Sequence, residues 1–243
     1  MTDANIIKPI NVHKINTSYT GKGVMVAVID SGINPYHSHV NGVEGGIQIR
    51  VNREQYIEYH HDYRDRLGHG TAVAAAIRGV AKEADLYGVK IFDDKLTTYP
   101  SVLAEAIEWS IENHVQIIHL SLGLTQDHAG VKDACKAAIE NNITIVAAMD
   151  RERGMIYPGS YPDVFHVQSG EVGRNEWAFH EDGSFIACGF PRELQGPTQL
   201  YNIHGHSFAA AHFTAYLALL LEEHPEWTCR QLWAYVETLR SYE

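Results

Sequence analysis

The sequence predicts an α/β protein built on a parallel sheet, and three observations support this fold class. Short apolar segments typical of buried strands alternate with helical segments over the first 150 residues. The connections between these segments are short, which suits right-handed crossovers between parallel strands. The chain of 243 residues shows no internal repeat and no low-complexity tract. We therefore expect a single domain over residues 1–243, with an N-terminal extension over 1–20 and a C-terminal helix within 228–243.

The first half of the chain supplies two strands and two helices. A Gly-rich turn precedes the apolar run 24–30, which is typical of a buried strand. Residues 71–80 are rich in alanine and predict a helix, and the apolar run 86–92 predicts a second strand. Ser101 is the expected N-cap of a helix that ends at Ile111.

The alternation continues into the middle of the chain and then weakens. The apolar runs 115–120 and 143–148 predict two further strands, with a helix over 131–139 between them. Beyond them, 164–167 predicts a strand, and we interpret 170–202 as irregular loops with short strands.

Two helices are expected near the C-terminus. Residues 207–221 are strongly apolar and Ala-rich, which predicts a mostly buried helix. Thr228 is the expected N-cap of a last helix over 230–239. The inner face of that last helix is expected to consist of Leu232, Val236 and Leu239.

Composition excludes several classes of protein. The 19 Lys and Arg residues against 30 Asp and Glu give a net charge of −11, which disfavours nucleic acid and anionic membrane surfaces as partners. No apolar run is long enough to span a membrane, and the first residues show no secretion signal. The three scattered cysteines, Cys135, Cys188 and Cys229, fit neither a disulfide framework nor a CxxC metal site. We therefore expect a soluble protein of the reducing cytoplasm.

Three side chains with complementary chemistry stand at the ends of predicted elements. Asp30 ends a buried strand, His69 lies between glycines at the start of an Ala-rich helix, and Ser207 opens an apolar helix. A serine hydroxyl becomes a good nucleophile when an imidazole accepts its proton, and a buried carboxylate can hold that imidazole in the correct tautomer. A helix N-terminus at the serine adds N–H donors where an oxyanion would develop.

These motifs resemble those of the subtilisin-like serine proteases, the subtilases. The resemblance rests on VAVIDSG around Asp30, GHGT around His69 and G-x-SFAAAH around Ser207, in that order along most of the chain. It implies a three-layer α/β/α sandwich with a mostly parallel central sheet. It also implies that Asp30 orients, His69 acts as general base and acid, and Ser207 is the nucleophile of a serine endopeptidase.

The resemblance further implies where a peptide substrate would lie. The peptide would add an extended strand along the segment that matches the family's substrate-binding strand, and one side chain would point toward the end of the strand over 143–148. The first segment consists of Ser121, Leu122 and Gly123. The second consists of Ala147, Ala148 and Met149.

Asp150 departs from the family pattern. The family usually has an asparagine there, whose amide donates to the oxyanion, and an ionised carboxylate cannot donate and would repel negative charge. An Asp150 kept protonated by its surroundings would restore a donor.

We expect an intracellular protease of narrow specificity, serving peptide maturation or activation of a partner protein. The alternative is a pseudoprotease, a regulatory peptide-binding subunit with negligible turnover. An esterase of another fold is disfavoured, because the G-x-S-x-G elbow is absent and the order is Asp, His, Ser.

Histidines raise the question of a metal. His204, His206 and His212 lie near Ser207, and the role of His206, which replaces the family's usual threonine, is open. No HExxH or CxxC spacing supports zinc, so we expect no cofactor. Structural calcium, common in the family, is left open because no acidic loop motif supports it.

A peptide or protein substrate is the expected partner, and a regulatory protein partner is left open.

Overall fold

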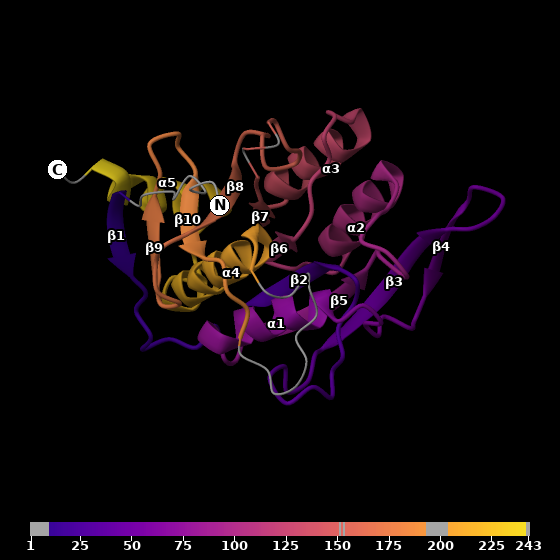
Figure 1. The fold of residues 1–243 in the computed structure, drawn as a ribbon, viewed down its shortest axis with the longest axis horizontal. Helices are drawn as coiled ribbons and strands as arrows, with labels where there is room; N and C mark the ends of the chain where they lie inside the picture. The colour runs from indigo at the N-terminus through magenta and orange to yellow at the C-terminus, as the bar shows by residue number, and fades with distance from the viewer. Residues whose placement is uncertain (1–9, 151, 153, 193–203, 242–243) are drawn as a thin grey trace, which may run out of the picture.

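The computed structural model describes residues 10–150, 152, 154–192 and 204–241, and its centre is one ten-stranded sheet. The strand order is β1-β9-β10-β8-β7-β6-β2-β5-β3-β4, which runs from left to right in Figure 1. All pairs from β10 through to β3 are parallel, and the pairs β1–β9, β9–β10 and β3–β4 are antiparallel. The strands are β1 (Ile10–Lys14), β2 (Met25–Asp30), β3 (Gly45–Val51), β4 (Ile57–His60), β5 (Asp85–Lys90), β6 (Ile117–Leu120), β7 (Thr144–Ala148), β8 (Val164–Gly170), β9 (Glu176–Phe179) and β10 (Phe185–Cys188).

Helices cover both faces of the sheet. One hydrophobic core lies between the sheet and α1, α4 and α5, and a second lies between the sheet and α2 and α3. The helices are α1 (His69–Val80), α2 (Pro100–Glu112), α3 (Ala129–Glu140), α4 (His206–Glu223) and α5 (Cys229–Thr238). A sheet covered on both faces needs strands that are apolar at successive positions, and β2 is completely buried from Val26 to Asp30. The three-layer α/β/α sandwich predicted from the sequence is therefore confirmed.

α4 is the central helix of its layer. Its residues from Phe208 to Leu221 are all buried, because the sheet, α1 and α5 surround it. Such a helix is apolar on every side rather than amphipathic, which explains why the sequence over 207–221 is so uniformly hydrophobic. Aromatic rings pack against it, with the Phe213 ring 4.8 Å from that of Phe185 and 5.5 Å from that of Trp177. None of the helices in the described part of the chain is long and apolar enough to cross a membrane.

Most predicted elements are confirmed to within a few residues, including the Thr228 N-cap, which forms a capping box with Gln231. One prediction was wrong. Helix α2 begins at Pro100 with Tyr99 at the N-cap, so Ser101 lies inside the helix. Proline suits the first helical position because its φ is already helical and its missing N–H would have no partner there.

Three strands near the edges of the sheet escaped prediction. The antiparallel hairpin β3–β4 forms one edge, and β1 forms the other by pairing with β9. Edge strands face water on one side and therefore carry polar residues, which hides their apolar pattern. In β4 the short sequence IEYH is an example.

Candidate active site

The candidate site lies at the carboxyl ends of the central parallel strands, where ligands collect in open α/β sheets. β2 ends at Asp30, α1 begins at His69, and Ser207 is the second residue of α4. The helices α1 and α4 pack against each other on the same face of the sheet. Three segments that are distant in the sequence thus each carry one of these residues at an end of an element.

Asp30 and His69 form a buried hydrogen-bonded pair. The Nδ1 atom of His69 lies 2.9 Å from both carboxylate oxygens of Asp30, and the two residues are 5% and 0% exposed. Burial alone would raise the pKa of Asp30, but the charge and hydrogen bond of His69 outweigh it and hold that pKa below its ordinary value. Burial would likewise lower the pKa of His69, but Asp30 raises it above its ordinary value. The pair therefore favours an imidazole that readily accepts a proton.

Asp65, a residue that the sequence analysis missed, fixes the turn before His69. One carboxylate oxygen accepts hydrogen bonds from the Ser31 hydroxyl and from the N–H groups of Leu67 and Gly68, at 2.8 to 2.9 Å. The other accepts from the N–H and hydroxyl of Thr71, at 2.9 and 2.6 Å. Asp65 thereby binds two N–H groups of the turn before α1 and one N–H group, that of Thr71, in the first turn of the helix, where a carboxylate is favourable. The signal available in the sequence was an acid four residues before a Gly-flanked histidine.

Gly70 allows α1 to approach the end of β2. A Cβ atom at residue 70 would lie 2.2 Å from the carbonyl oxygen of Gly32 and 3.2 Å from the Cβ of Asp30. Gly68 has a φ of 81°, in the left-handed region that favours glycine. The two glycines around His69 are therefore required by the close contact that brings its ring to Asp30.

Ser207 lies close to the same pair. Its Oγ donates a hydrogen bond to the carbonyl oxygen of Ser121, at 3.2 Å. The ring of Phe208, the next residue, lies 5.9 Å from the His69 ring between centroids. Because Ser207 occupies the first turn of an 18-residue helix, the positive end of the helix dipole is at its side chain.

His119 is a second residue that the sequence analysis did not identify. It lies in β6, is fully buried, and its Nδ1 and Nε2 atoms contact the hydroxyls of Thr214 and Ser121 at 2.9 and 2.6 Å. Burial lowers its pKa to about 4, so the ring is neutral near pH 7. His119 therefore ties α4 to the residue whose carbonyl accepts the Ser207 hydroxyl.

The two predicted substrate segments follow neighbouring strands. Ser121, Leu122 and Gly123 continue from β6, while Ala147 and Ala148 end β7. The second segment is buried, with Ala147, Ala148 and Met149 exposed by 0%, 8% and 4%. The side chain of Ile156 covers Gly123 of the first segment so closely that a Cβ at residue 123 would lie 2.0 Å from its Cγ2 atom.

A cavity of about 570 Å³ opens beside Met149. Its other lining residues are Gly154, Met155, Gly159, Ser160, Tyr161, Pro162 and His166. It combines apolar walls with a few polar groups, which is typical of a site for a side chain or small ligand.

Asp150 directly follows Met149 at the same edge of the sheet. Its Oδ1 lies 3.9 Å from Nε2 of His206, the residue before Ser207, and both side chains are about a quarter exposed. The other ring nitrogen of His206, Nδ1, accepts the N–H of Ser169 at 3.0 Å. The structure therefore pairs the two residues at which the sequence departs from the family pattern.

The remaining histidines of the predicted cluster do not form a metal site. His212 is buried and its Nδ1 bonds to the carbonyl of Phe208 within α4. Across the residues described, no group of three or more His, Cys, Asp or Glu is placed to hold a metal ion.

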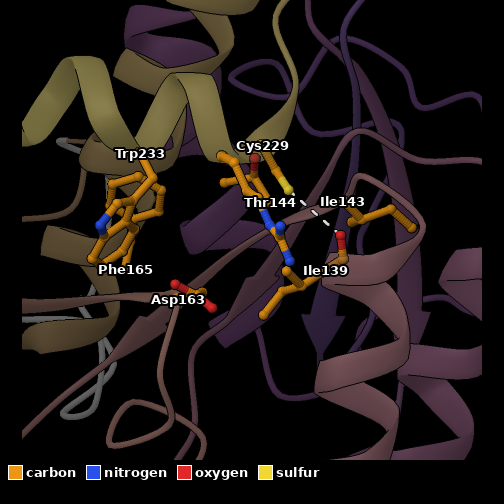
Figure 2. A pocket seen from close by; sticks show the side chains of 8 residues that line it. Ile139, Ile143, Thr144, Asp163, Phe165, Cys229 and Trp233 are labelled. Atoms are coloured by element: carbon orange, nitrogen blue, oxygen red, sulfur yellow. Dashed lines mark hydrogen bonds between the residues drawn. The ribbon is translucent and has the colours of Figure 1, made fainter.

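A second pocket, shown in Figure 2, lies near the beginnings of β7 and β8, whereas Asp30 stands at the end of β2. It is formed around Thr144 and Phe165, near the beginnings of β7 and β8, and around Cys229 and Trp233 of α5. The Cys229 thiol lies 3.5 Å from the carbonyl of Ile139. The residues that line this pocket include no arrangement of nucleophile and base comparable to Asp30, His69 and Ser207.

The fold is that of the subtilisin-like proteins. Residues 21–240 match the model of the subtilase family, peptidase S8. The chain therefore belongs to the subtilase family, whose members include the subtilisins, serine endopeptidases that need no cofactor for catalysis.

Known proteins agree with this assignment. Subtilisin E of Bacillus subtilis (strain 168) is 31% identical, over 92% of this chain and 62% of its own length. The subtilisin of Bacillus pumilus is also 31% identical, over 92% of this chain and 86% of its own length. Among solved structures, sphericase superimposes with a TM-score of 0.75 at 24% identity, over 92% of this chain and 85% of its own, which shows the same fold. The chain spans about 62% of the length of several curated relatives it matches.

Proposed function

We propose that this chain is a serine endopeptidase that uses Asp30, His69 and Ser207 as a catalytic triad. The observation that carries the proposal is the buried hydrogen bond between Asp30 and His69 at the edge where α4 presents Ser207. A carboxylate bound to Nδ1 leaves Nε2 as the basic nitrogen of the ring. Membership of the subtilase family supports the same roles.

The reaction follows from these positions. The Ser207 oxygen attacks the carbonyl carbon of the peptide bond while Nε2 of His69 takes its proton. His69 then gives that proton to the leaving amine nitrogen as the C–N bond breaks, which leaves an acyl ester on Ser207. Water attacks the ester with His69 as base, and Ser207 recovers its proton. Asp30 stabilises the imidazolium in both steps, in keeping with the raised pKa of His69.

The substrate is proposed to be a peptide of restricted sequence, bound in extended form. It would pair with Ser121, Leu122 and Gly123 and direct one side chain toward Ala147, Ala148 and Met149. The buried side chain of Ile156 covers Gly123 of the first segment, and the buried side chain of Met149 lines the cavity beside the second, which supports narrow specificity. We place its work inside the cell, in peptide maturation or activation of a partner protein, and three free thiols support a reducing compartment.

A second candidate function is supported by Asp150. A carboxylate beside the developing oxyanion would slow turnover, so the chain could serve as a pseudoprotease that binds peptides as a regulatory subunit. The two functions differ in whether Ser207 is an activated nucleophile.

A fluorophosphonate probe followed by mass spectrometry tests the proposal. We expect covalent labelling of Ser207 in the wild type, none in Ser207→Ala, and selective cleavage within a diverse peptide library. Binding of library peptides without labelling or cleavage would favour the regulatory subunit. Indiscriminate degradation of casein would contradict narrow specificity, and fractionation of the producing cells tests the cytoplasmic location.

A further inference from the structure

His206 presents its two ring nitrogens to two different partners. Nδ1 accepts the backbone N–H of Ser169, at 3.0 Å, and lies 3.2 Å from the Ser169 hydroxyl. A backbone N–H can only donate, so Nδ1 must carry the lone pair of the ring. The neutral imidazole then has its hydrogen on Nε2. This assignment follows from the hydrogen bond alone.

The Nε2–H group faces Asp150. The distance from Nε2 to Oδ1 of Asp150 is 3.9 Å, which is longer than a direct hydrogen bond, so the N–H dipole of the neutral ring acts on the carboxylate across this gap. The side chains are 29% and 27% exposed, so bulk water screens the interaction only in part. A donor is therefore directed at the one carboxylate whose charge opposes the proposed reaction.

The backbone around His206 is held rigidly, which fixes the direction of Nε2. Gly205 donates its N–H to the carbonyl of Gly189 at 2.9 Å, and Ser169 lies at the buried end of β8. His206 is also the first residue of α4, directly before Ser207. A ring anchored at Nδ1 cannot turn away from Asp150 without losing the Ser169 hydrogen bond.

We propose that His206 is a positioning residue for catalysis, whose Nε2–H holds the Asp150 carboxylate and offsets its charge beside the acyl oxygen of the substrate. The inference rests on the proposed protease function. The proposal explains how a subtilase can carry Asp150 in place of an amide donor. Asp150 and His206, the two residues that depart from the family pattern, then act together. His206 acts on the reaction through Asp150, so its effect depends on which residue stands at position 150.

The test is a double-mutant cycle of His206→Asn and Asp150→Asn. The Oδ1 atom of asparagine replaces Nδ1 as acceptor for Ser169, but its amide is too short to replace Nε2. We expect His206→Asn to lower kcat by about three- to fivefold, the scale of a partly exposed electrostatic contact, with KM and the melting temperature little changed. In the Asp150→Asn background the same substitution should change kcat by less than about 1.5-fold. His206→Gln, whose amide reaches the Nε2 position, should retain more kcat than His206→Asn despite lower stability.

Equal losses of kcat in both backgrounds would overturn the inference, because His206 would then act on Ser207 or on the loop. Failure of the wild type to react with the fluorophosphonate would instead overturn the protease function. A readout independent of activity keeps the two apart: the ¹⁵N chemical shifts of the His206 ring. We expect a protonated Nε2 whose resonance moves in Asp150→Asn, and a ring protonated on Nδ1 alone would contradict the inference.

Discussion

The candidate site has two halves, one around Asp30 and His69 and one around Asp150 and His206, which differ in the burial and hydrogen bonding of their side chains. Around His69 the groups are buried and joined by hydrogen bonds of 2.6 to 2.9 Å, from Asp30 to Asp65 and Thr71. Around Asp150 the side chains are about a quarter exposed, and the closest contact to His206 is 3.9 Å. The half that we propose generates the nucleophile follows the family pattern, and the half that we propose receives the oxyanion departs from it. Differences in rate between this chain and other subtilases should therefore originate in the second half.

Removing the charge of Asp30 should have the largest effect. Asp30→Asn keeps the shape of the side chain but favours the wrong tautomer of His69, so we expect kcat to fall by about 10⁴-fold, the scale found for such a change in a related triad. The measurement is peptide cleavage beside a thermal melt that shows an intact fold. A loss of kcat below tenfold would mean that the buried pair of Asp30 and His69 does not supply the base.

Asp150→Asn should act in the opposite direction. An amide at this position can donate to the oxyanion, so we expect kcat to rise by up to about 10²-fold. Cleavage of a peptide found in the library screen measures it, with Asp133→Asn, at an exposed position of α3, as a control for lost surface charge. An unchanged or lower rate would show that Asp150 is more than a poor donor.

The variant Asp65→Ala tests whether the hydrogen bonds around His69 contribute to the free energy of unfolding. Asp65→Ala leaves the N–H groups of Leu67, Gly68 and Thr71 without this acceptor, and we expect the free energy of unfolding to fall by about 2–3 kcal/mol. Urea unfolding measures the change. A loss under about 0.5 kcal/mol would show that water satisfies the turn equally well.

His119 should give the smallest effect, visible in acid. Its folded pKa of about 4 lies below the unfolded value of 6.5, so the unfolded state binds the proton more readily. The stability that this difference supplies is present above pH 6.5 and is lost as pH falls toward 4. Between pH 7 and pH 5 we expect the wild type to lose about 2 kcal/mol more than His119→Gln.

Urea unfolding at the two pH values measures the effect of His119. His61→Gln, at an exposed position, serves as the matched control and should lose stability with pH as the wild type does. Equal pH dependence of His119→Gln and the wild type would mean that the buried ring is not what acid disturbs.

Sequence patterns predicted the parts of the fold that are buried on both sides. β2 and α4 are uniformly apolar because protein surrounds them, so their signal is strong. Edge strands such as β4, and the position of Ser101 relative to Pro100, depend on local contacts that a periodicity does not record. Within the site, the motifs located Asp30, His69 and Ser207. The contact of His119 with Thr214 arises only when distant segments meet, so the sequence alone could not assign it. The contacts of Asp65 are mostly local, and its position four residues before His69 was a signal that the motifs did not include.

The enclosure of α4 has a consequence for how the protein responds to heat. The serine stands at the end of the most deeply packed helix, and no local opening can release that helix without exposing Phe208, Phe213 and the aromatic rings around them. Amide protons along α4 should therefore exchange with solvent only when the whole molecule unfolds. Because Ser207 is then displaced only when the whole protein unfolds, activity should be lost at the same temperature at which the protein melts.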